Sequence, residues 1–159
     1  MDWREDRVGS ALRGDNPLVM ARMRSGFAVI GDTQFQPGYS LLLTEDPSAN
    51  HLTDLDWSRR RQFLSDLALL GEAVETACKP RGLRRINYEV LGNALPLLHG
   101  HIHARYDWEQ PEMVTGPVWR YSQETRNAPE HAYSEEKDGE LRAAITAVLV
   151  ELIARRGDD

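Results

Sequence analysis

"LPLLHGHIHARY" (residues 95–106) carries three of the five histidines in the chain. His99, His101 and His103 occupy every second position, among apolar residues and glycine. Successive side chains of a β-strand point to opposite faces, so these imidazoles would share one face at intervals of about 7 Å. Residues 97–106 are therefore predicted to form a strand that presents three neighbouring imidazoles.

A hairpin is predicted upstream of this strand. The segment "SGFAVIGD" (25–32) is rich in strand-forming residues and ends on the turn signal Gly31-Asp32. Pro37-Gly38 marks a second turn, and "YSLLLT" (39–44) follows it. The two segments are expected to pair as antiparallel strands.

Two helices are expected from apolar residues that recur every three or four positions. The first runs from about Trp57 to Lys79 and is ended by Pro80 and Gly82. Its apolar stripe is Phe63, Leu67, Leu70, Val74 and Ala77. The second spans about 140–156, and one of its faces carries Leu141, Ile145, Val148 and Leu152.

The remaining segments give weaker signals. "RRINYEVL" (84–91) alternates apolar and polar residues, which is typical of a half-buried strand. "VWRYS" (118–122) is interpreted as a short strand, and residues 1–20 as an irregular or partly helical arm.

This order of elements predicts an α+β domain with a mainly antiparallel sheet. We expect one domain over residues 1–159, with its core at about 24–121 and a C-terminal helical extension at 122–159.

Composition narrows the class of protein. The net charge of −6 argues against a broad basic face for nucleic acid. Cys78 is the single cysteine, so no intrachain disulfide can form. The longest apolar stretch, 143–154, is interrupted by Glu151 and is too short to span a bilayer. We expect a cytoplasmic protein that has neither nucleic acid nor a membrane as its partner.

The histidine strand itself is open to three interpretations. It could be a polar face without chemistry. It could hold zinc through a His-x-His pair, with His51 or a carboxylate as the third ligand. It could also attack phosphorus, because neutral imidazole is a good nucleophile near neutral pH. The strand alone does not separate the metal site from the nucleophile.

Three segments in the same order resemble the histidine triad (HIT) superfamily of nucleotide hydrolases and transferases. They are "FQPGYSLLLTE" (35–45), "NHLTDLD" (50–56) and "INYEVLGNALPLLHGHIHARYDWE" (86–109). The resemblance covers about residues 24–106. It implies an α+β domain, usually a homodimer, and a histidine that attacks the α-phosphorus of a nucleotide and carries the nucleotidyl group transiently.

The register of the triad is set by two anchors outside the histidines. The family has a Gly-Gln pair four to five residues before its first histidine, and Gly92-Asn93 stands at that distance from Leu97. In the family, two residues follow the third histidine, and then often Pro-Arg. Ala104-Arg105 fits this spacing if the third histidine is His101. The triad positions would then be Leu97, His99 and His101, with the first histidine missing. The competing alignment takes 99, 101 and 103 as the triad.

In the favoured register the resemblance implies a catalytic role for two histidines. His99 would be the nucleophile, and His101 would stabilise charge on the phosphate oxygens. His103 would fall at a normally apolar position. The residues assigned to substrate binding are His51, Asn87, Asn93 and His103.

Other residues depart from the family pattern or have a structural interpretation. Ala94 stands where a phosphate-binding Ser or Thr is common, and Ala104 replaces the usual Pro. Trp108 and Trp119 are expected to be buried, although they could also reach a base or a dimer partner. Cys78 is expected to be inert core.

We therefore expect a nucleotide hydrolase or nucleotidyl transferase that works through a covalent nucleotidyl-histidine. It would require no metal, although Mg²⁺ would arrive with polyphosphate substrates. A homodimer is also expected, because the apolar stripe of helix 57–79 and the last helix need cover. The alternatives are a nucleotide-binding or regulatory module without turnover, which Leu97 and Ala94 favour, and a zinc enzyme.

Overall fold

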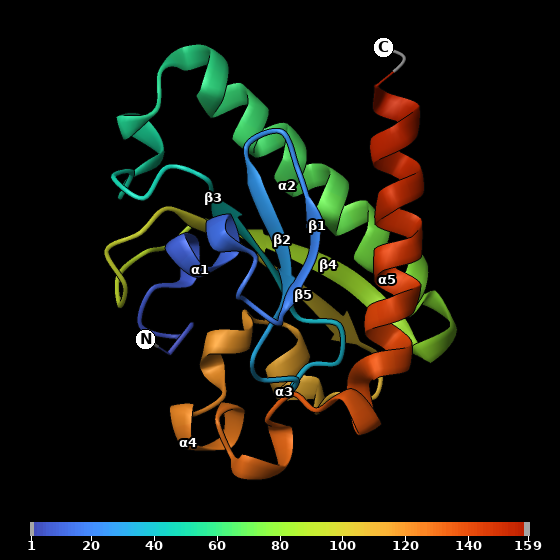
Figure 1. Cartoon of the computed structure of the whole chain (residues 1–159). Coiled ribbons are helices and arrows are strands. Elements are labelled where there is room, and N and C mark those ends of the chain that lie inside the picture. Colours follow the sequence, from blue (N-terminus) through green and yellow to red (C-terminus); the bar gives the residue numbers. More distant parts are fainter. Residues whose placement is uncertain (1, 158–159) are drawn as a thin grey trace.

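Five antiparallel strands form the centre of the structure, a computed structural model that describes residues 2–157. Their order across the sheet is β1-β2-β3-β5-β4 (Figure 1). The strands are β1 (Val19–Arg22), β2 (Gly26–Ile30), β3 (Ser40–Thr44), β4 (Leu83–Glu89) and β5 (His99–Tyr106). The predicted hairpin is confirmed, because β2 pairs with β3 in continuous register from Gly26–Thr44 to Ile30–Ser40.

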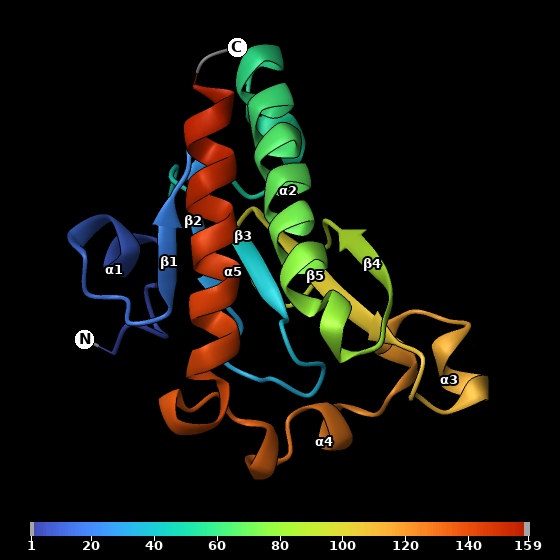
Figure 2. The ribbon, with the colours of Figure 1, turned by 90° about the vertical axis from the view of Figure 1, so that its right-hand side faces the viewer.

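Two long helices, α2 (Trp57–Cys78) and α5 (Glu135–Arg156), lie side by side across one face of this sheet (Figure 2). The Asp56 carboxylate caps the first turn of α2, and its predicted apolar stripe is buried against the sheet and α5. The stripe is thus covered within the chain and by itself requires no second copy. Across residues 2–157, no helix combines the length and apolar character that crossing a membrane requires.

Gly100 explains why a glycine interrupts the histidine strand. Its position faces α2, and a Cβ placed there would lie 2.6 Å from Leu67 Cδ1. Ile102, Ala104 and Tyr106 point to the same side and are fully buried. The histidines therefore occupy the opposite face of β5, away from the helices.

The structure corrects several predictions about the elements. The partly helical character predicted for the arm 1–20 is confirmed by α1 (Arg7–Arg13), but the last residues of the arm begin β1, a strand that was not predicted. "VWRYS" is not a strand, because Val118–Arg120 forms a 3₁₀ turn. α5 begins at Glu135 rather than near 140, because the Ser134 hydroxyl caps a polar first turn that has no apolar periodicity. The remaining short helices are α3 (Pro111–Val114) and α4 (Gln123–Arg126).

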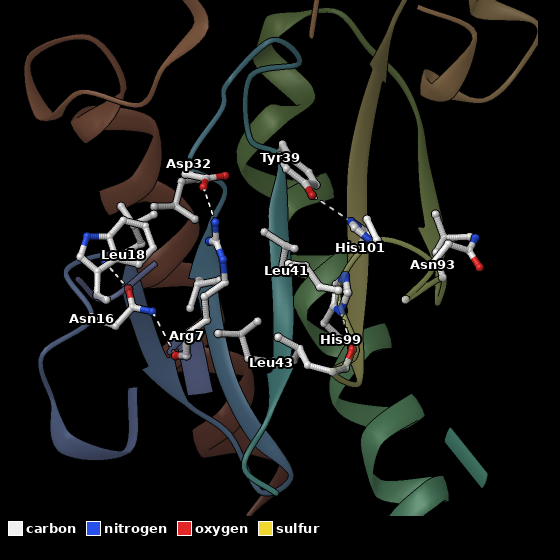
Figure 3. Close-up of a pocket in the computed structure, with 18 of the residues that line it drawn as sticks. Arg7, Asn16, Leu18, Asp32, Tyr39, Leu41, Leu43, Asn93, His99 and His101 are labelled. Atoms are coloured by element: carbon white, nitrogen blue, oxygen red, sulfur yellow. Dashed lines mark hydrogen bonds and ion pairs between the residues drawn. The ribbon is translucent and has the colours of Figure 1, made fainter. Parts of the chain in front are cut away.

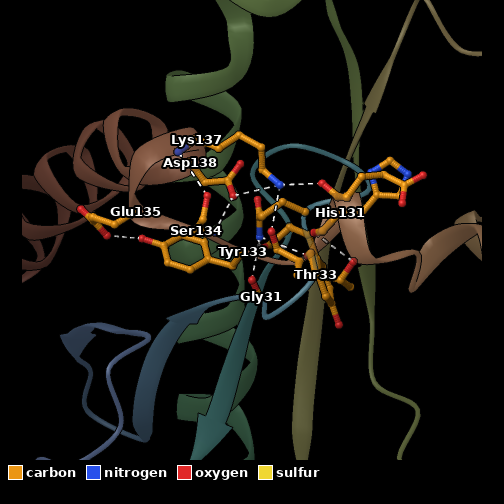
Figure 4. A network of polar contacts seen from close by, with 12 residues as sticks. Gly31, Thr33, His131, Tyr133, Ser134, Glu135, Lys137 and Asp138 are labelled. Atoms are coloured by element: carbon orange, nitrogen blue, oxygen red, sulfur yellow. Dashed lines mark hydrogen bonds and ion pairs between the residues drawn. The ribbon is translucent and has the colours of Figure 1, made fainter.

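Backbone hydrogen bonds tie the C-terminal segment to the connection between β2 and β3 (Figure 4). Gln34 N donates to His131 O at 2.6 Å, and Tyr133 N donates to Asp32 O at 3.0 Å. The Thr33 hydroxyl donates to the Arg126 carbonyl at 2.7 Å. Residues 126–133 are thereby held against residues 32–34, beside the open face of the sheet.

Asp66 on α2 joins three parts of the fold through a buried carboxylate. It accepts hydrogen bonds from Ser25 N at 2.7 Å and from Ser25 Oγ at 2.6 Å. It also pairs with Arg156 Nη2, at the end of α5, at 2.7 Å. Because the carboxylate is only 1% exposed, its removal would leave these donors without their acceptor.

Replacing Asp66 by Ala should lower the free energy of unfolding by about 2–4 kcal/mol, because a buried ion pair and its hydrogen bonds are broken. Urea denaturation followed by circular dichroism measures this. Glu151→Ala is the matched control: its pair with Arg155 on α5 is exposed and should contribute no more than about 1 kcal/mol. Equal losses for the two variants would contradict a structural role for the buried carboxylate.

Candidate functional site

A cavity of about 540 Å³ lies on the open face of the sheet (Figure 3). Its floor is the β3–β5 pair, where Leu43 lies opposite His99 and Leu41 lies opposite His101. The walls come from the α1 region, which contributes Arg7, and from the loop 91–97. The apolar floor and the few polar groups that converge on it are typical of a small-molecule site.

His99 is buried, and a backbone hydrogen bond orients its ring. Its Nδ1 lies 2.8 Å from the carbonyl oxygen of Leu97, which can only accept, so Nδ1 carries the proton. The other ring nitrogen, Nε2, then keeps its lone pair. Burial lowers the pKa of His99 below its usual value; the bond to Leu97 opposes this shift, and the charge on Arg7 adds to it. His99 is therefore a neutral imidazole with a defined tautomer.

His101 is oriented by a side chain instead. Its Nδ1 lies 2.8 Å from the hydroxyl oxygen of Tyr39. Burial raises the pKa of Tyr39, which keeps its proton and can donate it to Nδ1. His101 would then carry its own proton on Nε2, the reverse of His99. Burial and the neighbouring His99 lower the pKa of His101 to about 4.

His103 lies outside the main cavity, in a more enclosed place. Its ring stacks on Tyr39 at 4.3 Å between centroids, with the edge of Trp119 at 5.3 Å. Burial, followed by the charges of its neighbours, lowers its pKa to about 3. Its Nδ1 has no hydrogen-bond partner among residues 2–157, and Glu89 Oε2 lies 3.9 Å away.

An arginine and a carboxylate form the polar wall opposite the histidines. Arg7 Nη2 lies 2.7 Å from Asp32 Oδ2, and both side chains line the cavity. Both are partly exposed, so the pair is accessible to a ligand. Asp32 offsets part of the charge on Arg7, and the guanidinium remains the cationic group of this wall.

The other predicted binding residues are distributed around this centre. Asn93 lies on the loop between β4 and β5. It is exposed and lines the rim of the cavity. His51 is exposed and lines a smaller hollow of about 230 Å³ that His99 also borders. Asn87 lies on the edge strand β4, outside the main cavity, and its Oδ1 accepts a hydrogen bond from Arg105.

Arg105 and Glu109 form a buried ion pair that positions the segment after β5. The two side chains are 2% and 0% exposed and meet at 2.8 Å. Arg105 also donates to the carbonyls of Met113 and Gly116, and Tyr121 donates to Glu109 at 2.9 Å. The pair therefore fixes the turns that carry Trp119 to the histidines.

Sequence reasoning missed three residues of the site. Arg7 lies in the N-terminal arm, and nothing local links it to position 99. Tyr39 follows the Pro37-Gly38 turn, and only its pairing across the sheet reveals its contact with His101. Trp119 was expected to be buried, but it is 37% exposed and lines the cavity; Trp108 is 59% exposed and stacks on Tyr106. Cys78 is buried, as predicted.

The geometry bears on the metal-site interpretation. Within residues 2–157, no group of three or more His, Cys, Asp and Glu side chains is arranged to hold a metal ion. In this part of the chain, His99 and His101 thus have no third protein ligand of the kind that a catalytic zinc needs.

Solved structures with the same fold are histidine triad proteins. A histidine triad protein from Marinobacter aquaeolei VT8 superposes with a TM-score of 0.68 and 22% identity, over 84% of this chain and 89% of that one. A hypothetical histidine triad nucleotide-binding protein from Sulfolobus tokodaii superposes with a TM-score of 0.66 and 14% identity, over 91% of each chain. A Zn-bound histidine triad family protein from Mycobacterium smegmatis superposes with a TM-score of 0.56 and 14% identity, over 92% of this chain and 94% of that one.

The likeness is one of structure rather than of sequence. No protein-family model and no curated protein matches the chain. At identities this low, the superpositions establish the fold alone. The chain has the fold of the histidine triad proteins, and the resemblance that its sequence suggested is confirmed at that level.

Proposed function

We propose that the chain is a nucleotide hydrolase or nucleotidyl transferase that acts at the α-phosphorus, with His99 as its nucleophile. The observation that carries this proposal is the bond from His99 Nδ1 to the Leu97 carbonyl, which leaves Nε2 unprotonated on a floor shared with His101. The printed name of the Sulfolobus tokodaii protein, nucleotide-binding, supports the class of ligand. The same bond favours the register Leu97, His99, His101.

In the first step, the Nε2 lone pair of His99 attacks the α-phosphorus. A P–N bond forms, and the bond from phosphorus to the leaving group breaks, so that the leaving group departs with the electron pair. His101, protonated on Nε2 through its contact with Tyr39, donates a hydrogen bond to a non-bridging oxygen. Arg7 balances the negative charge of the nucleotide from the opposite wall.

In the second step, water or another acceptor attacks the phosphorus of the nucleotidyl-histidine. The P–N bond breaks, its electron pair returns to Nε2 of His99, and the proton of the acceptor passes to solvent water. Neither step requires a metal ion, and Mg²⁺ would enter bound to a polyphosphate substrate.

The second candidate is a binding module without turnover, which the missing first histidine at Leu97 favours. Its apolar side chain borders both the main cavity and the hollow of His51. The homodimer expected from the family resemblance remains a proposal, as does the cytoplasmic location expected from the composition.

Substitution of the histidines one at a time tests the register. His99→Ala should abolish turnover, a loss of several orders of magnitude, because no other group can form the intermediate. His101→Ala should cost about 10- to 1000-fold in kcat, because it removes one stabilising donor. His103→Ala should have the mildest effect. Steady-state kinetics with a fluorogenic nucleotide ester measures all three.

Circular dichroism checks the folding of each variant, and free imidazole should partly rescue His99→Gly. If His101→Ala is inactive and His99→Ala is merely slow, the alignment 99–101–103 is restored. Small and equal losses at all three positions, with no adduct in the mass spectrum, would leave the binding module.

The pH profile follows from the buried nucleophile. Because the pKa of His99 is lowered from 6.5, its active neutral form persists below neutrality, and kcat/KM should fall only below pH 6.5. Arg7→Gln removes a charge that lowers this pKa, so the acid limb should move to higher pH. Arg13→Gln, on the exposed side of α1, is the control and should leave the profile in place. An unmoved limb in Arg7→Gln would show that Arg7 does not act on the nucleophile.

Binding of a purine nucleoside monophosphate should not depend on metal. Titration calorimetry with AMP and GMP in the presence of EDTA should give the same affinity as without EDTA. Binding that is lost on chelation and restored by zinc would favour the zinc enzyme instead.

A further inference from the structure

A second compartment of about 290 Å³ adjoins the main cavity on the side of His103. One wall is the connection between β2 and β3, which contributes Gln36. The other wall is the segment 118–127, which contributes Trp119 and Arg126. The hydrogen bonds between residues 32–34 and 126–133, including that from the Thr33 hydroxyl to the Arg126 carbonyl, hold the two walls together.

Two buried polar atoms on this compartment lack a partner in the protein. Gln36 Oε1 and His103 Nδ1 form no hydrogen bond with any residue of the range 2–157, although their side chains are only 2% and 4% exposed. An unpaired buried polar atom costs about 1–3 kcal/mol. Each such atom needs an explanation, and a polar group of a ligand bound in the compartment would provide one.

Arg126 adds a cation that the protein leaves uncompensated. Its guanidinium lies over the ring of Trp119 at 4.7 Å, and its Nε donates to the Tyr121 carbonyl at 3.2 Å. Within residues 2–157 it forms no ion pair with a carboxylate. Its planar, rigid donors suit a carboxylate or phosphate.

The compartment lies next to the main cavity, in the direction that runs along β5 from His99 to His103. Tyr39 and Trp119 border both spaces, so the two spaces are adjacent. Along β5, His99 lies on the main cavity, His103 lies on the second compartment, and His101 stands between them. A group attached to a phosphorus above His101 would therefore extend toward His103.

We propose that this compartment binds the leaving group, and that the leaving group is small and carries an oxyanion. The inference rests on the proposed function, and it adds the class of substrate: a nucleotide joined at its α-phosphorus to a compact group with a carboxylate or phosphate. Arg126 pairs with the oxyanion, and Gln36 and His103 hydrogen-bond the atoms between it and the phosphorus. At about 290 Å³ the space is smaller than the main cavity of about 540 Å³, which suits a leaving group more compact than the nucleotide.

The test compares two conjugates of AMP, and the same two of GMP, joined through a P–N bond to glycine or to ethylamine. Both share the N–CH2 linkage, but only the glycine conjugate carries a carboxylate. Their dissociation constants are measured by calorimetry in the His99→Ala background, where neither is consumed. The glycine conjugate should bind about 10- to 100-fold more tightly. ADP, which carries a phosphate where the glycine conjugate carries a carboxylate, is measured in the same way. The comparison of its dissociation constant with that of the glycine conjugate shows which oxyanion the compartment prefers.

Arg126→Gln should abolish this preference while changing the affinity for the ethylamine conjugate less than twofold. Arg120→Gln is the matched control, because Arg120 lies in the same segment but donates to the Glu112 carbonyl at the surface. Equal affinity for the two conjugates, or an equal loss of both in Arg126→Gln, would overturn the inference and leave the proposed function intact. If neither conjugate nor the nucleotide alone binds, the proposed function fails and the inference fails with it.

Gln36→Met separates a ligand contact from a structural one. Because the amide oxygen has no protein partner, this near-isosteric change should leave the melting temperature unchanged or raise it. The preference for the glycine conjugate should nevertheless fall several-fold. A lowered melting temperature with the preference retained would show that the amide serves the fold and would remove it from the site.

Discussion

The alternation of side chains along β5 is the constraint on which the site depends. One face of this strand must pack against α2, and Gly100 allows Leu67 to approach it closely. The other face is thereby released from packing and carries the imidazoles. A shift of the strand by one residue would exchange the two faces, so the hydrophobic core fixes the direction in which the three histidines point.

Three imidazoles on one face also create an electrostatic problem. If more than one were charged, repulsion and the loss of hydration would both disfavour the folded state. Burial keeps His101 and His103 neutral, with pKa values of about 4 and 3. Under the proposed function, positive charge for the substrate comes instead from arginines on separate elements: Arg7, partly offset by Asp32, beside the main cavity and Arg126 beside the second compartment. The proposed nucleophile and its counter-charge are therefore different groups.

Periodicity in the sequence predicted the elements that bury a regular face. The β2–β3 hairpin, α2 and β5 follow directly from local patterns, and so does the placing of His99 and His101 together. Arg7, Tyr39 and Trp119 could not be predicted in the same way, because their roles depend on contacts between segments distant in sequence. The strand predicted for "VWRYS" was wrong for a related reason. The buried Arg105–Glu109 pair determines the course of that segment, so its own propensity for a strand does not decide its structure.

The ties between residues 126–133 and residues 32–34 run largely through main-chain atoms. A main-chain hydrogen bond does not depend on which side chain its residue carries. The walls of the second compartment can therefore persist while the side chains that line it are exchanged during evolution. If the compartment binds the leaving group as proposed, related chains could acquire a different preference through single substitutions at positions such as 36 or 126, with His99 and the rest of β5 left untouched.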